Sequence, residues 1–132
     1  MMSRMFVILS GSLGFIAVAL GAFGAHGLRA RFESLPDGAR RLEWWATAAH
    51  YNLVHALAIG FAAWLVHRGA GTSGSVAGWC FAVGTVVFSG SLYAMTLTGQ
   101  TKLGAITPFG GVMLLVGWGA VIVAGIRLTA DG

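Results

Sequence analysis

The chain has 132 residues, of which 57% are hydrophobic and only 9% are charged. A soluble domain carries about 25% charged residues, so this composition excludes an ordinary water-soluble protein and indicates a single integral membrane domain over residues 1–132. The formal net charge of +4 is small and scattered, which favours contact with membrane lipids, including anionic head groups, and argues against nucleic acid.

Cysteine and histidine usage gives no sign of a bound metal or cofactor. Cys80 is the only cysteine, so no internal disulfide can form. Neither a Cys-x-x-Cys nor a His-Glu-x-x-His motif is present, and we expect no metal and no cofactor.

The first predicted membrane helix covers residues 5–25, an apolar run that follows Arg4. A signal peptide is the alternative, but its apolar region is usually only about 7–15 residues long. Small residues recur every three or four positions, which places them on one helix face as a close-contact seam for a second helix. The seam consists of Ser10, Gly14, Ala17, Gly21 and Gly24.

Most of the charged residues lie between His26 and Glu43. Within this segment Pro36-Asp37-Gly38 predicts a turn, and its aspartate is a plausible N-cap for the helix that follows. The first turns of that helix should be amphipathic and lie in the membrane interface, with Trp44 and Trp45 at head-group level.

Three further membrane helices are predicted at residues 44–67, 76–98 and 106–127, each long enough to cross the roughly 20-residue apolar layer. Short loops at 69–75 and 99–105 separate them, and Thr107-Pro108 is a typical helix start. No strand-like alternation competes with this pattern. The predicted fold is therefore all-α, a four-helix transmembrane bundle with an amphipathic interfacial turn before the second helix.

Loop charges predict the orientation of the bundle. Four crossings place the first and third loops on one side of the membrane, and both termini with the second loop on the other. The positive-inside rule favours cytoplasmic first and third loops. The cationic residues on the two sides are Arg29, Arg31, Arg40, Arg41 and Lys102 against Arg4, Arg68 and Arg127.

The second predicted helix carries polar side chains into the membrane. Counted from Trp44, His55 lies about 16 Å along the helix axis, near the middle of the bilayer. A charge there is costly, so we expect a neutral imidazole that faces protein, water or a ligand. Tyr51 and Asn52 share its face, whereas His50 is rotated from it by about 140°.

Antiparallel threading brings further polar residues to the first-loop leaflet, and this clustering defines the candidate site. We expect His55 to form a hydrogen bond with at least one of Asn52, Ser91 and Tyr93, beside a pocket open toward that leaflet. Helix ends, register-fixing hydrogen bonds and simple packing are the structural alternatives at every position. The candidate ligand-binding residues are His26, Asn52, His55, Ser91, Tyr93 and Thr107, with His50, Ser89 and Lys102 as a second set.

Five sequence motifs occur in a specific order along the chain. They are Gly21-Ala22-Phe23-Gly24-Ala25-His26-Gly27-Leu28, His55-Ala56-Leu57, Phe88-Ser89-Gly90-Ser91-Leu92-Tyr93, Ile106-Thr107-Pro108-Phe109-Gly110-Gly111 and Gly117-Trp118. Together they resemble the YgdD-like family, the domain of unknown function 423 group of small multi-pass membrane proteins, over nearly the whole chain. The resemblance implies a helical protein of the bacterial plasma (inner) membrane, with relatives in mitochondria, and no established activity. His50 does not match a family position.

Three functions remain open at this stage. The first is a binding or translocation module for a small amphiphile, lipid or ion, in an oligomer of this chain. The second is a small structural or assembly subunit of a membrane complex, which docks other helices through its glycine seams. The third, an intramembrane enzyme, is disfavoured because no carboxylate lies in a predicted helix core, and we expect no catalytic residue.

Overall fold

The structure is a computed structural model and describes residues 1–130. Long helices account for most of this range, and short segments of other helical types join them. In chain order they are α1 (Met2–Phe23), the π-helical η1 (Gly24–Leu28), α2 (Arg29–Phe32), α3 (Gly38–His67), α4 (Gly71–Thr98), the 3₁₀-helical η2 (Thr101–Ala105) and α5 (Thr107–Ala130).

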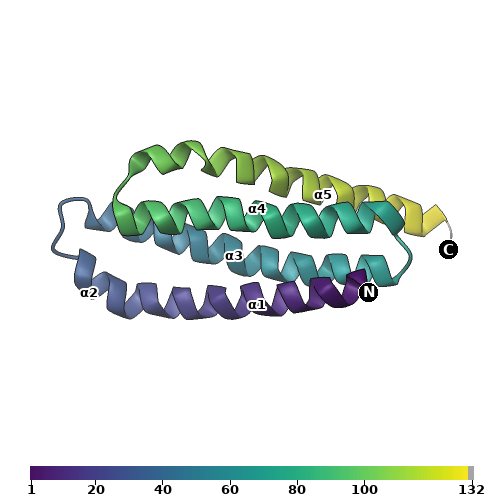
Figure 1. Cartoon of the computed structure of the whole chain (residues 1–132), viewed down its shortest axis with the longest axis horizontal. Helices are drawn as coiled ribbons and strands as arrows, with labels where there is room; N and C mark the ends of the chain where they lie inside the picture. The colour runs from purple at the N-terminus through teal and green to yellow at the C-terminus, as the bar shows by residue number, and fades with distance from the viewer. Residues whose placement is uncertain (131–132) are drawn as a thin grey trace.

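The helices lie antiparallel in the spatial order α1, α3, α4, α5, with both chain termini at the same end (Figure 1). The α3–α4 pair forms the centre, α1 packs against α3, and α5 packs against α4. Four helical stretches in the described residues are long and apolar enough to cross a membrane. The predicted fold class, a four-helix transmembrane bundle, is confirmed.

The seam predicted on the first helix faces α3. A Cβ atom added at Gly14 would lie 3.8 Å from the Cβ of Ala56, and one at Gly21 would lie 4.0 Å from the Cβ of Ala49. At one end of the same seam, Ser10 contacts Gly60. The two backbones approach closely because both helices present small residues at the contact.

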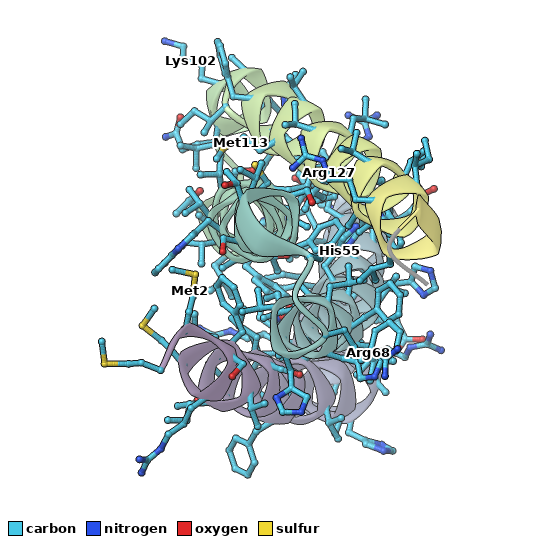
Figure 2. The ribbon with its side chains drawn as sticks, turned by 90° about the vertical axis from the view of Figure 1, so that its right-hand side faces the viewer. Met2, His55, Arg68, Lys102, Met113 and Arg127 are labelled. Carbon is cyan, nitrogen blue, oxygen red and sulfur yellow. The ribbon has the colours of Figure 1, made fainter. Side chains whose placement is uncertain are left out.

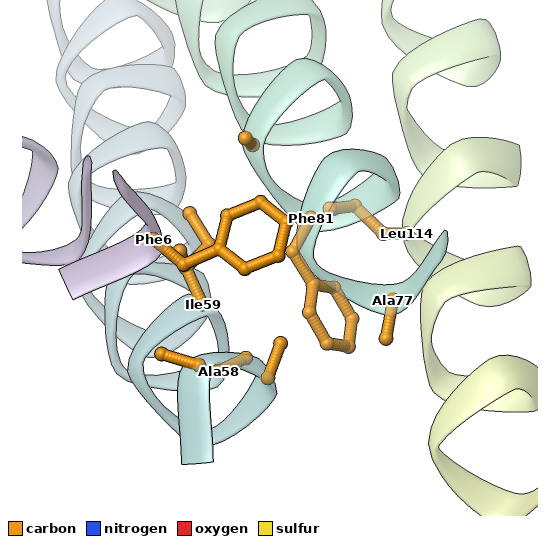
Figure 3. Packing of buried hydrophobic residues seen from close by; sticks show 9 residues of the cluster. Phe6, Ala58, Ile59, Ala77, Phe81 and Leu114 are labelled. Carbon is orange, nitrogen blue, oxygen red and sulfur yellow. The ribbon is translucent and has the colours of Figure 1, made fainter. Parts of the chain in front are cut away.

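A hydrophobic cluster joins all four long helices on the half of the bundle that contains the termini. Phe6, Ile59 and Phe81 are fully buried in it, and Leu114 is nearly so (Figure 3). The Phe6 ring occupies the space where Gly78 has no side chain, so a Cβ atom at that glycine would overlap the ring. Close packing of this kind fixes the relative positions of the helices.

The helix bounds differ from the predicted ones at several ends. The first helical stretch does not end at residue 25 but continues through η1 to Phe32. The start of α3 at Gly38 agrees with the helix expected directly after the Pro36-Asp37-Gly38 turn. The expected loop at 69–75 is much shorter, because α4 already begins at Gly71. Gly69 (φ 87°) and Gly71 (φ 58°) form the tight turn, while Ser73 and Gly74 are buried rather than exposed in a loop.

Arg41 joins the start of α3 to the end of α4. Its Nε donates to Thr96 O at 2.7 Å and its terminal nitrogen donates to Leu97 O at 3.2 Å, while the Thr96 hydroxyl donates back to Arg41 O at 3.1 Å. Asp37, the expected N-cap of α3, makes no capping hydrogen bond, and its carboxylate lies 3.8 Å from Arg41 instead. The guanidinium thus satisfies carbonyls that the last turn of α4 leaves without helical partners.

Candidate functional site

His55 lies on α3, inside the bundle, with only 5% of its surface exposed. Its Nδ1 is 2.9 Å from the carbonyl oxygen of Tyr51, one turn earlier on the same helix. Its Nε2 accepts the indole N–H of Trp118, which comes from α5, at 3.2 Å. Both ring nitrogens therefore have partners.

These two partners determine the tautomer of the imidazole. A carbonyl oxygen can only accept, so Nδ1 must carry the proton, and an indole N–H can only donate, so Nε2 must be the acceptor. A second proton on Nε2 would point at the indole N–H. The arrangement suits the neutral histidine expected at this depth, and it makes His55 a fixed polar group rather than an acid or base poised for catalysis.

Aromatic rings surround the imidazole. The Tyr51 ring stacks on it at 5.8 Å between centroids, with 15° between the planes, and in turn contacts Phe88 at 4.5 Å. On another side Phe81 lies 5.7 Å from His55 and packs edge-on against Trp118 at 4.9 Å. Four rings from three helices thus limit the movement of His55.

A lateral cavity of about 520 Å³ opens beside His55 and Trp118, and we call it the His55 groove. It lies between α3 and α5 and reaches α4 at Phe88, and the view along the helices shows His55 between the α3 and α5 ribbons (Figure 2). Leu115 (72% exposed) and Val112 (59% exposed) form part of its rim. The lining residues are Tyr51, His55, Phe88, Pro108, Gly111, Val112, Leu114, Leu115 and Trp118.

Asn52 and Tyr93 form a separate polar contact between α3 and α4. The amide nitrogen of Asn52 donates to the Tyr93 hydroxyl at 3.3 Å, and the Tyr93 ring packs against Trp45 at 4.7 Å. The Trp45 indole N–H donates to Leu20 O at 2.7 Å, just before η1. A Cβ atom at Gly24 would overlap Trp45, so this glycine allows the indole to lie against the π-helical turn.

Two serines of α4, Ser89 and Ser91, form hydrogen bonds with neighbouring helices. Ser91 and Thr107 share a hydrogen bond of 2.6 Å between their hydroxyls, which ties the start of α5 to α4. Ser91 also donates to Phe88 O at 2.8 Å, and Ser89 donates across to Ala48 O of α3 at 2.8 Å. The Ser91–Thr107 and Ser89–Ala48 bonds link neighbouring helices, the Ser91–Phe88 bond lies within α4, and neither serine nor Thr107 lines the His55 groove.

The predicted hydrogen bond between His55 and Asn52, Ser91 or Tyr93 is wrong. Each of those side chains has another partner. Asn52 and Tyr93 bond to each other, with the Tyr93 ring packed against Trp45, and Ser91 bonds to Thr107. The single predicted cluster is therefore three separate contacts.

The remaining candidates lie at the surface. His26 and Lys102 are exposed, at the end of the bundle that holds the first and third loops. His50 is also exposed, and it lines a smaller cavity of about 230 Å³ together with Tyr51, Val54 and His55. His50 thus shares a small cavity with His55, although it does not line the groove.

Two buried oxygen atoms lack a partner within the described residues, Asn52 Oδ1 and Thr85 Oγ1. The Ser89–Ala48 and Thr96–Arg41 hydrogen bonds set the antiparallel register of α3 and α4. Continued by one turn, this register places Thr85 level with Asn52.

The sequence reasoning missed most of the residues that form the groove. Trp118, Phe88, Pro108 and Gly111 occurred only in motifs, without a geometric role. A depth comparison across all four helices could have paired Trp118 with His55. Among residues 1–130, no three His, Cys, Asp or Glu side chains come together in a way that could hold a metal ion.

The fold and the intramembrane polar site define a small multi-pass membrane protein. A family model described as "Protein of unknown function (DUF423)" matches residues 20–111, and the chain belongs to that family. This agrees with the resemblance seen in the sequence motifs.

Relatives from distant bacteria match along nearly their whole length. The UPF0382 membrane protein YwdK of Bacillus subtilis (strain 168) is 41% identical over 125 residues, which cover 94% of this chain and 98% of that protein. The UPF0382 inner membrane protein YgdD of Escherichia coli (strain K12) is 40% identical over 139 residues, covering 100% and 97%. No solved structure matches the chain.

Proposed function

We propose that the protein binds a small amphiphile, such as a lipid or another apolar molecule with one polar group, in the His55 groove. The observation that carries this proposal is the hydrogen bond between the buried His55 and the partly exposed Trp118, beside a cavity of about 520 Å³ whose rim is exposed. Ligand sites are typically concave, mostly apolar and supplied with a few fixed polar groups.

The groove offers different chemistry along its length. Leu114, Leu115 and Val112 provide an aliphatic wall for a hydrocarbon chain. Tyr51 is 40% exposed, and its hydroxyl has no hydrogen-bond partner within the described residues. That hydroxyl is the hydrogen-bonding group available to a ligand's polar end, whereas the nitrogens of His55 and Trp118 are already paired and give the groove a fixed polar surface.

The second candidate function, a docking subunit, has less support. Its main feature was the glycine seam of α1, and that seam is already covered by α3 of the same chain. Other surfaces of the bundle remain open for a partner or for a second copy of the chain, so homo-oligomerisation stays part of the proposal.

The location follows from the relatives and the spans. The Escherichia coli relative is named an inner membrane protein, and four stretches of this chain can span a membrane. This supports the bacterial plasma (inner) membrane as the location of a multi-pass protein. We further propose, from the loop charges alone, that the first and third loops lie on the cytoplasmic side.

A comparison of co-purified molecules tests the binding proposal. Leu115→Trp would fill the groove, whereas Ile122→Trp alters an equally exposed position of α5 (65%) that does not line it. Each protein is extracted in native nanodiscs, and bound small molecules are identified by mass spectrometry. A compound enriched with wild type and Ile122→Trp, but not with Leu115→Trp, supports the proposal. Equal recovery from all three proteins would rule it out.

A further inference from the structure

A second groove lies between α1 and α3 at the opposite end of the bundle from the first and third loops, and we call it the terminal groove. It has a volume of about 340 Å³ and is lined by residues from the start of α1 and the end of α3. No part of the proposed function uses it. Its lining residues are Ser3, Arg4, Val7, Gly60, Ala63, Trp64 and His67.

The helix register separates the lining into a polar end and an apolar end. Ser10 contacts Gly60, and Gly14 lies against Ala56, so α1 and α3 run antiparallel with constant offset. Continued toward the N-terminus, this offset places Ser3 and Arg4 level with His67, at the ends of both helices. Val7 and Ala63 lie at one level deeper in the span, and Gly60 lies deeper still.

The apolar part has the shape of a track for a hydrocarbon chain. Ala63 is 3% exposed and forms the floor together with Gly60, which has no side chain to fill the space. Val7 (59% exposed) and Trp64 (49% exposed) form the two walls. Trp64 is held in place by stacking on Phe61 at 5.4 Å between ring centroids.

The polar end carries positive charge. Arg4 lines the groove, and the guanidinium of Arg68 lies 5.9 Å from the centroid of the Trp64 ring. Within residues 1–130 the acidic residues, Glu33, Asp37 and Glu43, all lie toward the other end of the bundle. Arginine binds phosphate oxygens through paired N–H groups, and Ser3 and His67 add further hydrogen-bonding groups.

We propose that the terminal groove binds an anionic phospholipid, with its phosphate at Arg4 and His67 and one acyl chain along Val7, Gly60, Ala63 and Trp64. The positive end and the apolar track lie in the order and at the depth that a phospholipid of that leaflet requires. This site is independent of the His55 groove, which lies on the other side of α3.

Fluorine spectroscopy can observe the two grooves separately. Protein labelled with 5-fluorotryptophan gives one signal for each tryptophan, and Trp→Phe variants assign Trp64 for the terminal groove and Trp118 for the His55 groove. The labelled protein is placed in phosphatidylcholine nanodiscs with a rising fraction of phosphatidylglycerol. The Trp64 signal should shift and saturate at a low fraction, and the Trp118 signal should not follow it.

Matched variants show whether the groove itself is responsible. Arg4→Gln combined with His67→Gln should raise the fraction of phosphatidylglycerol needed for half of the Trp64 shift by at least about fivefold, as expected for the loss of one basic contact. Arg31→Gln removes the same charge from the other end and should leave the titration unchanged. Val7→Phe narrows the groove and should weaken the shift, whereas Val18→Phe, at a similarly exposed position of α1 (62%), should not.

Three results would overturn the proposal. The first is a Trp64 signal that does not shift as the fraction of phosphatidylglycerol rises. The second is an equal loss with Arg31→Gln, which would indicate general surface charge. The third is a wild-type response in both the Arg4/His67 and Val7 variants. If the His55 groove proves to bind no ligand, each of these results can still be interpreted, because the Trp64 and Trp118 signals are separate.

Discussion

The indole Nε1 of Trp118 and Nε2 of His55 lie 3.2 Å apart and connect α5 to α3, two helices that both pack against α4. Both side chains line the His55 groove. Because Nδ1 of the same ring is held by Tyr51 O at 2.9 Å, the imidazole has one allowed orientation. The groove therefore has a fixed polar point in an apolar surrounding, which is what discrimination among amphiphiles needs.

The strength of that bond can be measured with a double-mutant cycle. His55→Phe and Trp118→Phe each remove one partner, and the double variant removes both. Polar contacts between membrane helices are worth about 0.6 kcal/mol on average and at most about 1.7. We expect a coupling free energy in that range from unfolding in detergent. A coupling of zero would mean that the two side chains do not interact in the folded protein.

Ligand recovery should depend on His55 far more than on His50. His55→Phe should keep the bundle folded and abolish enrichment of the compound bound in the groove, because it removes the fixed polar point. His50→Phe changes an exposed side chain outside the groove and should have a mild effect. The measurement is the nanodisc mass spectrometry described above. Equal losses in both variants would argue against a specific role for His55.

The glycine seam predicts a contrast within one helix. Gly14→Leu and Gly21→Leu place a bulky side chain against Ala56 and Ala49, and overpacking of this kind costs about 1–3 kcal/mol. Gly11→Leu is the matched control, because a Cβ atom at Gly11 has nothing within 4 Å. Thermal unfolding in detergent should separate the first two variants from the third. Wild-type stability in all of them would mean that the seam faces lipid.

The seam also shows which features of the fold could be predicted from the sequence. Four apolar runs of membrane-spanning length, and small residues at helical spacing, were enough to predict the helices and the face that α1 turns toward a neighbour. The π-helical turn of Gly24–Leu28 was not predicted, because spacing alone does not show where a helix accepts an extra residue per turn. That turn lies within the glycine-rich motif and receives Trp45.

The candidate site was predictable in depth but not in its contacts. Position along a helix placed His55 near the middle of the membrane, and it is buried there. Its partner Trp118 depends on how α5 packs beside α3, and no local pattern contains that information. Tyr93 had the right depth for His55 but turns to Asn52 and Trp45, because side-chain direction is set by neighbours that the sequence pattern cannot identify.

Arg41 should stabilise the bundle through the end of α4 and not through its ion pair. Arg41→Met removes the donors to Thr96 O and Leu97 O, and we expect a loss of about 1–2 kcal/mol, as for a cation at a helix C-terminus. Asp37→Asn breaks the 3.8 Å ion pair of a half-exposed carboxylate and should cost less than about 0.5 kcal/mol. Arg40→Met, at an exposed position, is the charge control. Denaturant unfolding compares the three, and a larger loss with Asp37→Asn would reverse this interpretation.

The topology can be tested with single cysteines in a Cys80→Ala background. Arg29→Cys and Lys102→Cys mark the end with the first and third loops, and Thr72→Cys marks the end with the short second loop, where Gly71 (φ 58°) is itself a poor site for a side chain. All three positions are exposed. With cytoplasmic first and third loops, a membrane-impermeant maleimide should label Thr72→Cys in intact spheroplasts, and should label the other two only after permeabilisation. The reverse pattern would keep the four-span fold and invert its orientation. Labelling of all three positions from the same side would contradict the fold itself, because an odd number of crossings must separate Arg29 from Thr72.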